Sequence, residues 1–178
     1  MNHRLMTALG IASALFLGNG CKSMGFMTGS PEAVCQISGL DNSQIKGKAT
    51  FTQEADDVLV EVELDGLSPG KHGIHIHEHG DCGGVSGASA GGHFDVLKHN
   101  HGAAGMVDSH EGDLGNIVAD SKGHARLSLA DKWLRLSGDQ SILGRSIVVH
   151  AGEDDQVSQP AGNSGARVAC GLITAAIR

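Results

Sequence analysis

The chain has 178 residues, which is enough for one domain and little else. Its formal net charge is −7 and it contains no block of basic residues, so nucleic acid is not expected as a partner. An anionic substrate would need a local positive charge to overcome this acidic background.

The first 20 residues have the pattern of an export signal. Arg4 precedes an apolar stretch over residues 5–17, which is shorter than the ~20 residues that span a bilayer. Small residues before Cys21 predict lipoprotein-type cleavage with lipid on Cys21, and ordinary cleavage or retention is the alternative. We expect a signal peptide over 1–20, a tether over 21–31 and one domain over 32–178, in the periplasm or cell envelope. Contact with a membrane is expected only through the lipid.

Short alternating segments dominate the rest of the chain. Residues 57–67 place apolar side chains on one face and acidic ones on the other, as a half-buried strand does. Similar runs occur at 33–40, 47–53, 73–78, 115–120, 124–130, 133–137, 145–150 and 167–174. Glycine-rich turns separate them, so we expect an all-β sandwich or barrel.

Two regions interrupt this pattern. Residues 80–114 are rich in Gly, His and Asp, and residues 151–166 are polar and rich in turn formers. A loop of ~30 residues without strands is unusual in a compact domain unless it is functional. A metal ion and a disulfide are the candidates for holding the first loop in place.

The cysteine count suggests one disulfide. With Cys21 assigned to lipid, three cysteines remain, and one pair with one free thiol is the simplest arrangement in an oxidising compartment. Cys35 lies among strand-type apolar residues and is expected to be a buried, inert thiol. Cys82 and Cys170 would then form the pair.

Histidines carry the functional signal, because ten of the 11 fall between positions 72 and 150. In "HGIHIHEHGD" the strand period places His75 and His77 on one face, where two imidazoles can hold one metal ion. Taken alone, an exposed polar strand face is the alternative. His150, at the end of another apolar run, is followed by an acidic cluster that could anchor the outer nitrogen of a ligand. A solvated acidic turn is the alternative for that cluster.

The loop between these strands offers a second donor set. Its candidates are His93, His99, His101, His110 and Asp113. Several imidazoles with one carboxylate suit a four-coordinate zinc ion.

Five motifs together resemble those of the copper–zinc superoxide dismutase family. They are "HGIHIHEHGDC", "GGHFD", "HEGDLGN", "GRSIVVH" and "GNSGARVACGLI", in the order and roughly the spacing of that family. The resemblance covers about Ala33 to Ile177. It implies an eight-stranded antiparallel Greek-key β-barrel with two long functional loops, a zinc and disulfide loop and an electrostatic loop. These match the two interrupting regions.

The resemblance also implies both ligand sets. The copper ligands would be His75, His77, His93 and His150, and the zinc ligands His93, His101, His110 and Asp113, with His93 bridging. His99 competes with His101 for one zinc position, and the spacing to His110 favours His101. His79 is expected to bind no metal.

Further residues take their roles from the same resemblance. His72 would make a structural hydrogen bond to backbone, and Asp154 would link a copper-ligand histidine to a zinc-ligand histidine. Cys82 and Cys170 match the family disulfide. Arg167 would bind the superoxide anion beside copper, and His93 would take up a proton during turnover.

The implied activity is dismutation of superoxide to dioxygen and hydrogen peroxide, by one-electron cycling of copper beside a structural zinc. The alternative is an exported, non-catalytic copper- and zinc-binding or buffering protein with the same fold. A homodimer is possible, and the sequence leaves the interface open.

Overall fold

The computed structural model describes residues 32–177. Its strands are β1 (Ala33–Gly39), β2 (Lys46–Glu54), β3 (Asp57–Asp65), β4 (Gly70–His77), β5 (Asp113–Ala119), β6 (Ala125–Asp131), β7 (Ser146–His150) and β8 (Arg167–Ala175). One short 3-10 segment, η1 (Val85–Ala90), lies in the loop after β4. The predicted signal peptide, the Cys21 lipidation site and the tether lie outside the described residues.

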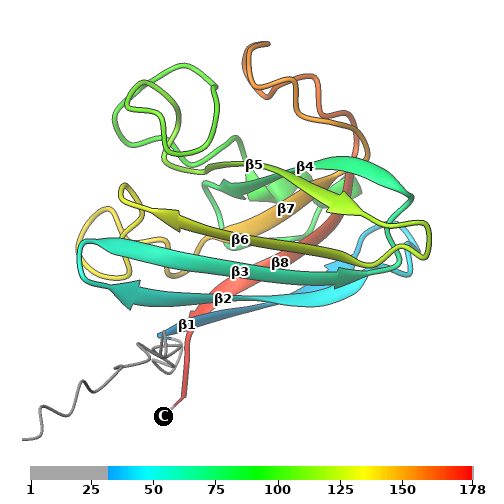
Figure 1. The fold of residues 1–178 in the computed structure, drawn as a ribbon, viewed down its shortest axis with the longest axis horizontal. Coiled ribbons are helices and arrows are strands. Elements are labelled where there is room, and N and C mark those ends of the chain that lie inside the picture. The colour runs from blue at the N-terminus through cyan, green and yellow to red at the C-terminus, as the bar shows by residue number, and fades with distance from the viewer. Residues whose placement is uncertain (1–31, 178) are drawn as a thin grey trace, which may run out of the picture.

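The eight strands close into a barrel in the order β1-β2-β3-β6-β5-β4-β7-β8 (Figure 1). Every neighbouring pair is antiparallel. β3 pairs with β6 and β4 pairs with β7, so two connections pass over intervening strands, as in a Greek key. The predicted all-β barrel is therefore confirmed.

Alternation of side chains builds the core, as it was predicted to do. In β3, Val58, Val60, Val62 and Leu64 are almost fully buried, while Glu61 and Glu63, at the alternate positions, are exposed. β4 differs because both of its faces are covered beyond Lys71. Ile74 and Ile76 belong to the hydrophobic core. The opposite face, which carries the alternate histidines, is buried beneath the loops.

The prediction of a strand at 133–137 was wrong. β6 ends at Asp131, whose carboxylate accepts hydrogen bonds from the backbone N–H groups of Trp133 (2.7 Å) and Leu134 (3.1 Å). These bonds turn the chain away from the sheet. Leu134 is buried at the barrel end, so its apolar character reflects core packing rather than a strand.

Both interrupting loops lie on the same side of the barrel, beside β4, β5 and β7 (Figure 1). The disulfide Cys82–Cys170 ties the first loop to β8, and this pairing was predicted. Cys35 is the predicted buried free thiol, and burial raises the pKa of this thiol to about 12, which keeps it unreactive. Within residues 32–177, no helix has the length and hydropathy needed to cross a membrane.

Candidate metal centre

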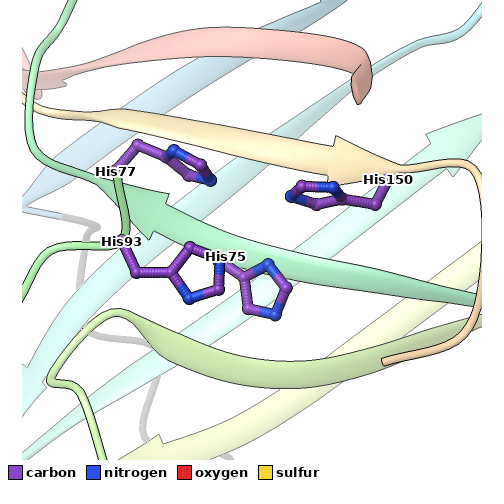
Figure 2. A group of neighbouring side chains, drawn as sticks. All are labelled: His75, His77, His93 and His150. Atoms are coloured by element: carbon purple, nitrogen blue, oxygen red, sulfur yellow. The ribbon is translucent and has the colours of Figure 1, made fainter. Parts of the chain in front are cut away.

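Four histidine rings face one small space between two strands (Figure 2). β4 supplies His75 and His77, because alternate residues of a strand point to the same face. β7 supplies His150, and the first loop supplies His93, whose backbone forms a bridge with His77. One nitrogen from each ring lies within 4.8 Å of the others, so the four rings can bind one ion.

The nitrogens that face this space have no hydrogen-bond partner. They are His75 Nδ1, His77 Nε2, His93 Nε2 and His150 Nε2, all fully buried. The outer Nδ1 atoms of His77 and His150 donate to the carbonyls of Gly91 (3.0 Å) and Gly165 (3.1 Å). Because these outer nitrogens carry the hydrogen, the inner ones present lone pairs. Unpartnered buried lone pairs from four imidazoles fit a copper ion.

Burial keeps these rings neutral. It lowers the pKa of His75 to about 3, that of His77 to about 2 and that of His150 to about 4. The positive charge of Arg167 lowers the pKa values of His77 and His150 further. The ligand atoms are therefore free of protons at neutral pH and ready to accept a metal ion.

A second group of donors converges on Asp113. Its Oδ1 lies 2.8 Å from His93 Nδ1, 3.0 Å from His101 Nδ1 and 3.3 Å from His110 Nδ1. Its Oδ2 accepts hydrogen bonds from the backbone N–H groups of Gly102 and His110, which orient the carboxylate. Three imidazole nitrogens around one buried carboxylate oxygen fit a four-coordinate zinc ion.

His110 is the least enclosed member of this second group. Its side chain is 10% exposed, and its ring centroid lies 5.5 Å from that of His93. The set of donors around Asp113 whose atoms all lie within 4.8 Å of one another contains His75 and not His110. The Nε2 of His75 is engaged by Asp154, and its Nδ1 faces the other site. Assignment of His110 as the fourth zinc ligand is therefore a proposal.

Asp154 links the two groups, as predicted. Its Oδ2 lies 2.9 Å from His75 Nε2 and its Oδ1 lies 2.8 Å from His101 Nε2. Burial raises the pKa of Asp154, but the bonds with these histidines outweigh burial and hold it below its ordinary value. Burial lowers the pKa of His101, but its bonds to Asp113 and Asp154 raise it to about 9. Without a metal, His101 is an imidazolium between two carboxylates.

Arg167 lies beside the four histidines that fit a copper ion. Its Nη1 donates to Gly87 O (2.6 Å) and its Nη2 donates to Gly91 O (2.5 Å). Gly91 O also accepts from His77 Nδ1, so one carbonyl orients both the arginine and a candidate ligand. Sequence reasoning found Arg167 but not the role of Gly91, because nothing in a glycine-rich loop indicates which carbonyl faces the site.

His72, His79 and His99 lie outside the two donor groups. His72 Nδ1 donates to His150 O (2.8 Å), and its Nε2 lies 3.2 Å from Ser68 Oγ, which can donate to it. His79 is exposed, because β4 ends at His77. His99 is partly buried, and its Nδ1 donates to Ser109 O (3.0 Å), which holds the loop. His99 is thus a structural residue of the loop.

Asn116 is a residue of the centre that the sequence reasoning missed. Its side-chain Nδ2 donates to Asp154 O (2.9 Å), and its Oδ1 accepts from Asp154 N (2.8 Å). This paired contact fixes the backbone of Asp154. Asn116 lies in the motif "HEGDLGN", but it is 38 residues from Asp154, so the sequence did not indicate that the two residues are in contact.

Comparison with known proteins supports one family. A family model described as copper/zinc superoxide dismutase matches residues 45–173. Superoxide dismutase (Cu-Zn) 2 of Mesembryanthemum crystallinum is 45% identical over 150 residues, which cover 80% of this chain and 94% of that protein. Superoxide dismutase (Cu-Zn) 3 of Arabidopsis thaliana is 43% identical over 82% of this chain and 91% of its own length.

An animal relative named as extracellular is similarly close. The extracellular superoxide dismutase (Cu-Zn) of Drosophila melanogaster is 44% identical over 142 residues, which cover 75% of this chain and 77% of that protein. The closed barrel, the two adjoining donor groups and these matches lead to one conclusion. The chain belongs to the copper/zinc superoxide dismutase family.

Proposed function

We propose that the protein catalyses dismutation of superoxide to dioxygen and hydrogen peroxide at a two-metal centre. Copper is held by His75, His77, His93 and His150, and zinc by His93, His101, His110 and Asp113. The observation that carries the proposal is the position of His93. Its unpartnered Nε2 faces the copper group, while its Nδ1 faces Asp113 in the zinc group.

Copper bound by imidazoles supplies a centre that both accepts and gives one electron, whereas zinc is redox-inactive and supplies a structural positive charge. The protein's contribution is a dry, preorganised set of donors. All four copper-facing rings are buried, and Gly91, Gly165 and Asp154 orient the outer nitrogens of three of them.

His93 is suited to holding a proton during turnover. It has two nitrogens that face different donor groups, so Nε2 can take a proton while Nδ1 stays in the zinc group. The isolated β-bridge between His93 and His77 holds its backbone in place. A ring fixed in this way can deliver the proton without moving far.

Arg167 supplies the positive charge that attracts and orients the anion. The net charge of −7 repels superoxide at long range, so attraction has to be local. Two of the five N–H donors of Arg167 bind Gly87 and Gly91, which fixes the guanidinium plane beside His77. A fixed planar cation orients a small anion better than a mobile one does.

Metal reconstitution tests this function. The metal-free protein should gain superoxide dismutase activity in proportion to bound copper when zinc is also present, and zinc alone should give none. Arg167→Ala should keep both metals but lose at least about 10-fold in kcat/KM. Full occupancy with no turnover above that of free copper would instead support the non-catalytic buffering alternative.

The protein is exported to an oxidising compartment, the periplasm or cell envelope. The disulfide Cys82–Cys170 supports export, as do relatives named extracellular superoxide dismutase in Brugia pahangi and Drosophila melanogaster. Anchoring through lipid on Cys21 accompanies export. Mass spectrometry of the mature N-terminus tests it, because a free or uncleaved Cys21 would exclude the anchor.

A homodimer formed through the last strand is the proposed assembly. Leu172 on β8 is 42% exposed, and Leu143, just before β7 in the sequence, is 36% exposed. These exposed apolar side chains support an apolar contact between two copies of the chain. Light scattering coupled to gel filtration would give the mass. A Leu172→Glu variant should be monomeric if this face is the interface.

A further inference from the structure

The side chain of Gln159 pairs with both backbone groups of a candidate zinc ligand. Its Oε1 accepts a hydrogen bond from His101 N (2.8 Å), and its Nε2 donates to His101 O (2.9 Å). Nε2 also lies 3.1 Å from Val157 O in its own loop. The electrostatic loop, residues 151–166, is thereby bonded to the backbone of the zinc loop at the position of a ligand.

The same loop also covers the ring of His101. Gly162 packs against the hydrogen bond between His101 and Asp154, so closely that a Cβ would lie 2.6 Å from His101 Nε2 and 1.8 Å from Asp154 Oδ1. Only glycine fits there, and its φ of +63° also favours glycine. Asp155 N donates to Gly162 O (2.9 Å), which keeps this backbone in place.

Gln159 and Asn116 act on opposite ends of one hydrogen bond. Asn116 pairs with the backbone N–H and C=O of Asp154, as Gln159 does with those of His101. The His101–Asp154 bond between them is fully buried. Each end of this link is therefore fixed by a side-chain amide from a different element.

We propose that Gln159 is a positioning residue for the zinc site. It holds the backbone of His101 so that Nδ1 faces Asp113 while Nε2 faces Asp154. It also couples zinc binding to the folding of the electrostatic loop over the site. The inference rests on the proposed role of His101 as a zinc ligand. Its physical basis is that a ligand already held in its bound geometry loses less conformational freedom when the metal binds.

The matched control lies in the same loop. Asn163 is exposed like Gln159, and its side chain makes two hydrogen bonds, to Asp155 Oδ2 (3.1 Å) and Ser158 Oγ (2.9 Å). Neither partner is His101. Asn163→Gly removes these bonds and tolerates the φ of +51° at that position. It perturbs the loop without touching the ligand.

The experiment measures zinc affinity of the metal-free full chain by competition with a chromophoric chelator. Gln159→Ala should weaken zinc binding about 10-fold or more, as the loss of a residue that orients a metal ligand commonly does. Gln159→Glu keeps the acceptor for His101 N but loses the donor to His101 O, and should also weaken binding. Asn163→Gly should stay within about 2-fold of the wild type, which is small beside that effect. Cobalt substituted at the zinc site should show altered visible absorption only in the Gln159 variants.

Two results would overturn the inference. One is zinc affinity in Gln159→Ala equal to that of the wild type, and the other is an equal loss in Asn163→Gly. His101→Ala separates this inference from the ligand assignment. If His101→Ala binds zinc as tightly as the wild type, the proposed ligand set is wrong, whatever Gln159 does.

Discussion

At the scale of single residues, the centre depends on what binds the outer nitrogen of each histidine. His77 and His79 illustrate this, because both lie on the same face by alternation. The outer nitrogen of His77 is bonded to Gly91 O, which aims its Nε2 into the copper group. His79 lies beyond the end of β4 and is exposed. Identical side chains two positions apart therefore have different roles.

Replacing these two histidines separately tests that distinction. His77→Ala removes one of four copper donors and should lower superoxide dismutase activity by at least about 100-fold, with a matching loss of copper affinity. His79→Ala removes an exposed ring and should leave copper content and activity within about 2-fold of the wild type. Both are measured after reconstitution with copper and zinc. Equal losses in the two variants would mean that the histidines act as an unspecific metal-binding tract.

At the scale of elements, the turn between β1 and β2 supports the segment that holds Arg167. Ser86 in η1 donates its hydroxyl to Asp41 Oδ2 (2.5 Å). The next residue, Gly87, packs on Leu40 and offers its carbonyl to Arg167 Nη1. The turn thus contributes to the position of the arginine without contacting the metal centre.

Asp41→Ala should therefore change anion binding. Loss of the Ser86 contact should loosen the carbonyl of Gly87, lower kcat/KM roughly 10-fold or less and weaken binding of azide to the copper-loaded protein. Asp56→Ala, in the exposed turn between β2 and β3, is the control and should alter neither quantity. If Asp41→Ala lowers only the melting temperature and leaves azide affinity unchanged, the contact is structural and does not position Arg167.

At the scale of the whole molecule, the buried histidines make the stability of the metal-free protein depend on pH. The pKa values of His75, His77 and His150 are lowered to about 3, 2 and 4, so below pH ~6.5 the unfolded chain binds protons that the folded chain does not. Stability falls as the pH decreases through that range. The pKa of His101 is raised to about 9, so the folded chain keeps a proton above pH ~6.5 that the unfolded chain loses. Stability therefore also falls as the pH rises above about 6.5.

We therefore expect the metal-free protein to be most stable near pH 6.5. The free energy of unfolding should change more steeply with pH on the acid side than on the alkaline side, where His101 alone contributes. Each histidine involved contributes about 1.4 kcal/mol per pH unit. Urea unfolding at pH 5, 6.5 and 8 would measure it. A continuous rise in stability from pH 5 to 8 would contradict a protonated His101 in the metal-free site. Zinc should remove the alkaline decline, because it takes the place of that proton.

The sequence by itself determined the barrel and most of the candidate ligands. Period-two alternation predicted the strands and the shared face of His75 and His77, but it left both a sandwich and a barrel open. The closed barrel and the assignment of ligands to two metals followed from the resemblance of five motifs to a known family. The prediction failed at 133–137, because Leu134 is buried at the barrel end without belonging to a strand. Alternating apolar residues indicate which side chains are buried. They form a strand only when the backbone of a neighbouring strand is close enough to pair with theirs.

Only the tertiary structure decided which atoms of those residues face a metal ion. His99 and His101 competed for one position in the sequence, where spacing favoured His101, and the structure places only the ring of His101 between Asp113 and Asp154. The contacts that orient it come from Gln159 and Gly162, more than 50 residues away along the chain. A hydrogen bond requires a particular distance and direction between two atoms, and residues remote in sequence reach that geometry only when the folded barrel brings their loops together.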